Sequence, residues 1–183
     1  MEIYESKQTG LASGASEPIT VADVKGWSLI ETTADDTVIE AIIVSAREMV
    51  ENFLSKDIVS KDRILFVDEP EDSENTIILP YGAKDGTITV NVDGEDLTLG
   101  DDYTIVGIGN KYIRLNSYGT NITINYESDT ISSPSELELA KSATKVLIEQ
   151  VYDNRANLEG DSDIIMLDRN VKMMLNPLRT MYL

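Results

Sequence analysis

Apolar positions recur along this chain with two different periods. Between residues 35 and 55 they follow one another at steps of three and four, which is typical of one face of an α-helix. A second helical stripe runs from Leu139 to Tyr152. Between residues 63 and 126 the period changes to two, which is typical of strands with one buried face. The members of the first stripe are Val38, Ile39, Ile42, Ala46, Met49, Val50 and Phe53.

Polar residues mark where the helices begin. Thr20 followed by Asp23 forms a near-capping box, and Asp35 or Asp36 can cap the first long stripe. Ser133 and Pro134 supply an N-cap and a proline at the first helical position of the second stripe. Asp168 can cap one or two last turns, which Pro177 ends.

Short β-branched segments fill the middle of the chain. Asp93-Gly94 is the strongest turn between them, because both residues tolerate the positive φ of a tight hairpin. We therefore expect an antiparallel sheet. The predicted strands are 64–67, 76–79, 88–92, 97–99, 103–106, 112–115 and 122–126.

These patterns predict an α+β fold: a small bundle of about four helices with an inserted antiparallel β-sheet lobe. Residues 18–62 and 131–183 are assigned to the bundle and residues 63–130 to the lobe. Residues 1–17 contain few bulky apolar side chains, so we expect a flexible arm there. We also expect the two long helices to pack antiparallel, with Trp27 and the last helix closing the core.

The composition excludes most catalytic chemistry. The chain has 183 residues and contains neither cysteine nor histidine, which removes thiol nucleophiles, disulfides, imidazole bases and the usual zinc ligands. We predict no catalytic residue, no cofactor and no metal site. No apolar run is long enough to span a bilayer, and no signal sequence is evident, so we expect synthesis in the cytoplasm and no membrane contact.

The charge is strongly acidic, with 15 basic against 33 acidic residues and a net charge of −18. Such a field repels phosphate, so the sequence argues against wrapping of nucleic acid. Solubility, a DNA-mimicking surface and a wall that DNA slides past remain open as explanations. The carboxylates of segment 68–74 could bind calcium, but a solvated loop explains them more simply. Those of segments 93–96 and 100–102 could act in sugar hydrolysis, but acids in turns are the simpler explanation.

The C-terminal segment departs from this acidic background. No acid follows Asp168, whereas three bases do, and the chain ends in apolar residues. A basic segment with an apolar tip on an acidic protein indicates a docking element, although cations also complement a helix C-terminus. The residues of this predicted docking segment are Arg169, Lys172, Arg179, Met181, Tyr182 and Leu183.

Several segments together resemble the head-tail connector (adaptor, or head completion) proteins of long-tailed bacteriophages. The N-terminal segments are 18–25 and 35–51, and the C-terminal ones are 147–155 and 174–179. The helix that ends in Tyr152, Asn154 and Arg155 is similar to a motif of that family, and residues 93–126 are similar to the β insertion of one of its branches.

The resemblance implies a structural virion protein rather than an enzyme. Its copies would form a homo-oligomeric ring of about twelve under the capsid portal, at the head-tail junction. The ring would extend the DNA channel without specific DNA binding and would contact the portal protein on one side and a tail or head-closure protein on the other. The basic C-terminal segment would be the part that docks on the portal.

Two other classes of protein fit part of the sequence. An acidic, DNA-mimicking inhibitor would bind the basic cleft of a nuclease, and a carboxylate-dependent hydrolase would need two acids converging in a pocket. The oligomeric state in the presence of portal protein distinguishes them.

Overall fold

The protein consists of two compact units, each formed by segments that are separate in the sequence. The computed structural model describes residues 4–68, 76–107, 110–117, 119–154 and 167–179. The helical unit consists of segments Ser16–Ile58 and Ile131–Met181. The strand unit includes segments Met1–Ala15 and Val59–Thr130. The helices and antiparallel sheets confirm the predicted α+β fold.

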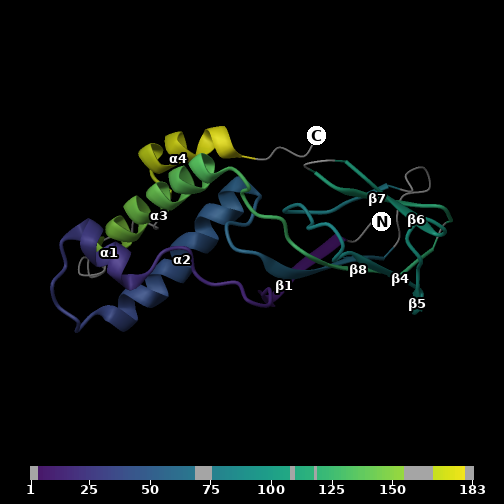
Figure 1. Ribbon diagram of the computed structural model, residues 1–183, viewed down its shortest axis with the longest axis horizontal. Helices are drawn as coiled ribbons and strands as arrows, with labels where there is room; N and C mark the ends of the chain where they lie inside the picture. Colours follow the sequence, from purple (N-terminus) through teal and green to yellow (C-terminus); the bar gives the residue numbers. More distant parts are fainter. Residues whose placement is uncertain (1–3, 69–75, 108–109, 118, 155–166, 180–183) are drawn as a thin grey trace. The chain divides into compact units, whose positions relative to one another are not determined.

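The helical unit is built around two long antiparallel helices. It contains α1 (Val21–Ser28), α2 (Asp36–Leu54), α3 (Pro134–Asn154) and α4 (Arg169–Leu175), and α4 continues into a 3₁₀ turn, η2 (Asn176–Leu178). Figure 1 shows α2 and α3 side by side, running in opposite directions. Their shared core includes the fully buried residues Ile39, Ala46, Val50, Leu54, Ala140, Ala143, Leu147, Ile148, Val171 and Leu175. No helix in the described ranges is long and apolar enough to cross a membrane.

The predicted helix starts are largely confirmed. The Thr20 side chain accepts a hydrogen bond from the Asp23 N–H, and the Asp23 carboxylate bonds the Thr20 N–H in return. Pro134 is the first residue of α3, as expected. Trp27, however, does not close the core: its side chain is 48% exposed and its indole N–H donates to Glu149 at 3.2 Å.

Two charged residues of α2 are buried together, which the apolar stripe of this helix does not predict. Arg47 and Glu51 are 3% and 1% exposed and are joined by a 2.5 Å ion pair one helical turn apart. Arg47 also binds Glu17 through Nε and Nη2, at 2.8 and 3.0 Å. The second carboxylate oxygen of Glu51 accepts the Ile58 N–H at 2.8 Å. The cluster thus connects the segment that enters α1 with the segment that leaves α2.

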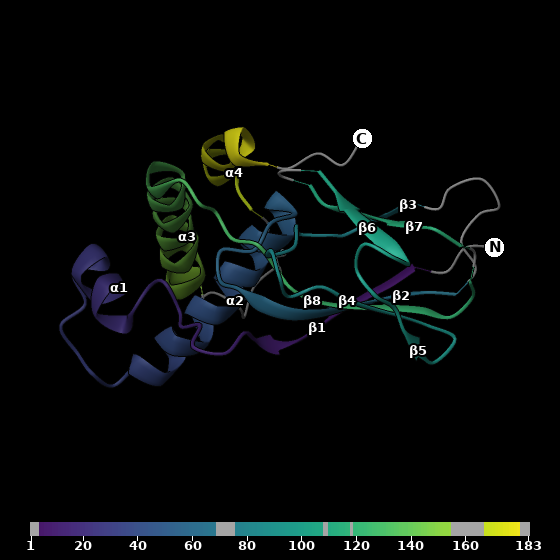
Figure 2. The same ribbon diagram turned by 45° about the vertical axis from the view of Figure 1, so that its right-hand side comes forward.

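The strand unit contains two antiparallel sheets rather than the single sheet that we predicted. The five-stranded sheet has the order β1-β2-β8-β4-β5, and the three-stranded sheet has the order β3-β7-β6. Both sheets contribute side chains to one apolar core, and Figure 2 shows their strands. The strands are β1 (Tyr4–Leu11), β2 (Lys61–Val67), β3 (Thr76–Ile78), β4 (Thr89–Val92), β5 (Glu95–Asp96), β6 (Tyr103–Val106), β7 (Tyr112–Leu115) and β8 (Ile122–Glu127).

The prediction of a flexible N-terminal arm is wrong for Tyr4–Leu11. These residues form β1, an edge strand that pairs antiparallel with the whole of β2. The side chains from Glu5 to Leu11 are exposed, so the strand is held mainly through its backbone, which leaves no apolar pattern in the sequence. One side-chain contact adds to this pairing, because the buried ammonium of Lys61 donates to Gln8 at 2.9 Å.

The hairpin predicted at Asp93-Gly94 is confirmed. Both residues have positive φ, of 51° and 91°, and they join β4 to β5 through the pair Val92 and Glu95. The strand predicted at 97–99 is not formed, because Glu95–Asp96 takes its place beside β4 and only an isolated bridge from Leu99 follows.

Replacing Arg47 with Met should strongly destabilise the helical unit. The change leaves the buried Glu51 carboxylate without its ion-pair partner, which costs about 3–5 kcal/mol of unfolding free energy. Chemical unfolding followed by circular dichroism measures this loss.

The matched control is Lys141→Met, which removes an i,i+3 pair with a largely exposed Glu138 and should change the unfolding free energy by no more than about 0.5 kcal/mol. Equal losses in the two variants would contradict a structural role for the Arg47 cluster.

Candidate functional site

The predicted docking segment begins with α4, which is capped by Asp168 and packs against α3. Asp168 is the N-cap of α4, and its carboxylate accepts the Val171 N–H at 2.9 Å. The same carboxylate accepts the side-chain amide of Gln150 on α3 at 2.8 Å. These hydrogen bonds, led by that of the Val171 N–H, hold the pKa of Asp168 below its ordinary value. With Val171 and Leu175 buried beneath it, α4 has a fixed orientation on α3.

The side of α4 that faces solvent is basic. Arg169 and Lys172 are exposed and lie three residues apart, so they are neighbours on one helical face. Met173 lies next to them in the sequence and is 63% exposed. Arg179, after the 3₁₀ turn, lies over the Phe53 ring at 5.4 Å. We call Arg169, Lys172, Met173 and Arg179 the basic face.

The remaining predicted site residues have different positions. Met181, Tyr182, Leu183 and Arg155 lie outside the described residues. Asn154 is exposed at the end of α3.

Tyr152 has a structural contact that the sequence did not reveal. Its hydroxyl donates to the carboxylate of Asp35 at 2.7 Å. Asp35 is the N-cap residue of α2, and its side chain makes no capping bond to the helix backbone. The hydrogen bond therefore joins the last turn of α3 to the first turn of α2, which gives the tyrosine of the helix-end motif a role in fixing the bundle.

The strand unit carries the opposite charge. Residues 85–110 contain six acids and no base. Uncharged donors hold several of these acids: Asp93 accepts from the Asn121 and Thr120 side chains at 3.0 and 2.9 Å, and Asp102 accepts the Thr98 N–H at 2.8 Å. The bonds from Asn121 and Thr120 keep the pKa of Asp93 low. We call this group the acidic tip: Asp93, Glu95, Asp96, Asp101 and Asp102.

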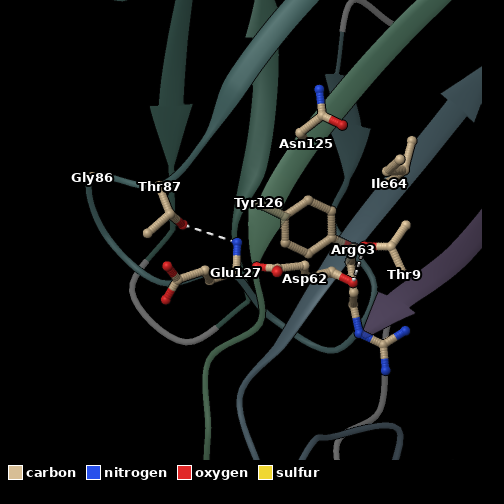
Figure 3. Close-up of a pocket in the computed structure, with 9 residues that line it drawn as sticks. All are labelled: Thr9, Asp62, Arg63, Ile64, Gly86, Thr87, Asn125, Tyr126 and Glu127. Atoms are coloured by element: carbon tan, nitrogen blue, oxygen red, sulfur yellow. Dashed lines mark hydrogen bonds between the residues drawn. The ribbon is translucent and has the colours of Figure 1, made fainter. Parts of the chain in front are cut away.

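An open hollow of about 420 Å³ lies beside β2 and β8 of the strand unit. In Figure 3 its walls are held by two hydrogen bonds, from the Thr9 hydroxyl to the Asp62 carbonyl at 3.2 Å and from the Glu127 N–H to the Thr87 hydroxyl at 3.1 Å. The hollow is lined by Thr9, Asp62, Arg63, Ile64, Gly86, Thr87, Asn125, Tyr126 and Glu127.

Two acids, Asp62 and Glu127, are among the residues that line the hollow. Glu127 is paired with Lys84 at 2.6 Å, and within the described residues no group of three or more metal-ligating side chains comes together. The acids at 93–96 and 101–102 lie in and around turns and do not converge on the hollow. The acidic segment 68–74, which the sequence explains most simply as a solvated loop, lies outside the described residues except for Asp68.

Sequence reasoning missed the buried cluster of Arg47, Glu51 and Glu17. In the sequence, Arg47 and Glu51 form an i,i+4 pair of opposite charge beside the apolar stripe. Exposed ion pairs have the same spacing, so this spacing does not indicate burial. Only the contact with Glu17, 30 residues away, distinguishes the buried pair, and no local pattern predicts it.

The chain is similar to components of phage-like particles. The family model described as "Head completion protein" matches residues 17–174. A protein in the neck of an empty gene transfer agent particle computed with C6 symmetry has a TM-score of 0.68 at 16% identity, over 98% of this chain and 97% of that one. A protein in the virion of a native gene transfer agent particle has a TM-score of 0.69 at 16% identity, over 97% and 96%. No curated protein sequence matches the chain.

Replacing Asp168 with Asn should weaken the anchoring of α4 in a pH-dependent way. Because the folded state lowers the pKa of Asp168, its stabilisation is complete above the ordinary aspartate pKa of about 3.9 and is lost as the pH falls through the lowered value. The variant should therefore have a lower melting temperature than the wild type at pH 7. This difference in melting temperature should become smaller as the pH is lowered towards 3. Thermal unfolding followed by circular dichroism across this range measures the difference.

The control is Glu40→Gln, which removes the same charge from an exposed position of α2. It should show no such difference at pH 7. A difference for Asp168→Asn that stays constant from pH 7 to pH 3 would contradict the assigned role of the carboxylate.

Proposed function

Because the chain belongs to the head completion protein family, we propose that its copies form a ring under the capsid portal that links head to tail. The family is one of structural components of phage-like particles and not of enzymes. The observation that carries the proposal is the extent of the match, since residues 17–174 include most of the helical unit and the segment Val59–Thr130 of the strand unit. The virion would then be the site of action, after synthesis in the host cell.

A ring is the arrangement that we expect for copies of a protein that surround a channel. Copies that surround a channel are related by rotation about its axis, so each uses two different surfaces for its two neighbours. The similar neck protein belongs to a particle computed with C6 symmetry, and copies around a six-fold axis come in multiples of six. About twelve copies fit this rule and the ring that we expect under a portal.

The excess negative charge suits a channel through which DNA passes. Carboxylates repel phosphates, so an acidic wall keeps DNA from adhering while it moves. Asp93, Asp96 and Asp102 of the acidic tip accept hydrogen bonds from amide or hydroxyl donors, and none of the ion pairs among the described residues involves the acidic tip. This chain would accordingly pass DNA without binding it specifically, and would need no cofactor.

The basic face and the C-terminal residues after it would dock on the portal protein. Arg169, Lys172 and Arg179 are exposed, and Met173 adds an apolar contact among them. A complementary acidic surface on the portal would attract this segment at long range, and ordering of the last residues on contact would add affinity. The opposite end of the ring would receive a tail or head-closure protein.

Truncation after Pro177 should abolish portal binding without unfolding the bundle. The change removes Arg179 and the apolar end of the chain but leaves the buried Val171 and Leu175 in place. Co-purification of the truncated chain with the portal protein of the same particle, together with its melting temperature, gives the test.

A second variant, Arg169→Glu/Lys172→Glu, reverses the charge of the basic face at exposed positions and should also lose the portal. The control Lys84→Glu/Arg114→Glu makes the same change in net charge on the strand unit and should retain it. If the folded truncated chain still co-purifies with portal, docking through this segment is wrong. If the full chain never binds portal and never forms rings, the proposed function itself fails.

A further inference from the structure

Strand β1 (Tyr4–Leu11) leaves one edge of the five-stranded sheet open. It pairs with β2 on one side, and in the described part of the chain no strand covers its other side. The strand order β1-β2-β8-β4-β5 places β1 at this edge, and Figure 2 draws it in purple. The side chains of Glu5–Leu11 are all exposed. An open edge of this length presents backbone N–H and C=O groups that readily pair with another strand.

The charges on β1 are arranged so that the strand complements itself. Glu5 and Lys7 lie two residues apart, so both side chains project from the same face of the sheet. Neither forms an ion pair with another described residue. If a second copy of β1 pairs antiparallel about Ser6, Glu5 lies directly opposite Lys7 of that copy, and Lys7 lies opposite its Glu5.

Other registers lack this match. A shift by two residues in one direction brings Glu5 opposite Glu5, and a shift in the other direction brings Lys7 opposite Lys7, and like charges in these positions are destabilising. The β-bulge between Gln8 and Gly10 limits the ladder at its other end, because a bulge disrupts regular pairing. The charges and the bulge therefore select one register, centred on Ser6.

We propose that β1 is a self-pairing edge through which two copies of the free protein form an antiparallel dimer. The two five-stranded sheets then become one continuous sheet across a two-fold axis. Such a contact uses the same surface on both copies, so it closes on itself and cannot propagate around a polar ring. It belongs to the protein before assembly, where it protects the open edge from aggregation, and it stands whether or not the proposed function holds.

Charge exchange on β1 tests the pairing. Glu5→Lys and Lys7→Glu each place like charges opposite one another twice in the dimer, and each should weaken dimerisation about tenfold. The double variant Glu5→Lys/Lys7→Glu restores both opposite pairs and should recover the wild-type dissociation constant. Sedimentation equilibrium of the full chain at low salt, with circular dichroism to confirm folding, measures all four proteins.

A crosslink tests the register directly. Ser6 would lie opposite Ser6 of the second copy, with Cα atoms about 4.5–5.5 Å apart, which is within disulfide range. The chain has no cysteine, so Ser6→Cys introduces the only thiol. Oxidation should convert this variant to a covalent dimer, whereas Ser135→Cys, an exposed position on α3, should remain uncrosslinked.

The outcomes separate the proposal from its alternatives. Loss of dimer in both single variants, recovery in the double variant and crosslinking only at position 6 support it. A wild-type protein that is monomeric at the highest concentration reached overturns it. So does a dimer or ring that neither single charge change weakens, because another surface then joins the copies.

Discussion

The buried ion cluster of Arg47, Glu51 and Glu17 is the constraint on which the helical unit depends. Burial alone lowers the pKa of Arg47, but the hydrogen bonds and charges of Glu17 and Glu51 outweigh it and raise the pKa above its ordinary value. The arginine therefore stays charged, and because it is buried, Glu17 and Glu51 must remain within hydrogen-bonding distance of it. Because Glu17 precedes α1 and Glu51 binds the Ile58 N–H beyond α2, the cluster fixes the chain at both ends of the first helical segment.

This constraint explains how a small bundle can carry a large insertion. The larger part of the strand unit, Val59–Thr130, is inserted between α2 and α3, and the strand unit has an apolar core of its own. Tyr152 provides a second connection, since its hydrogen bond to Asp35 joins the end of α3 to the start of α2. Polar connections of this kind within the bundle resist the rotation of one helix against another.

Local signals in the sequence predicted a large part of the fold. The Thr20 capping box, the Pro134 helix start and the Asp93-Gly94 hairpin each depend on neighbours within a few residues, so their chemistry is readable without the fold. Strand β1 was not readable, because backbone pairing with β2 needs no particular side chains.

The candidate site shows the same limit. The basic residues after Asp168 could be found from charge alone, but not the anchoring of α4 by Gln150, which depends on a contact across 18 residues. The exposed position of Trp27 was missed because a lone tryptophan beside an apolar stripe suggests a core residue, whereas here its indole binds Glu149 on the surface of α3.

Imaging the intact particle by electron cryomicroscopy tests the central claim most directly. The account predicts a ring of density between the portal and the tail into which the helical unit and the strand unit of this chain each fit, repeated around the channel axis. Density at that junction that is fully explained by other proteins, with this chain absent from the particle, would contradict it.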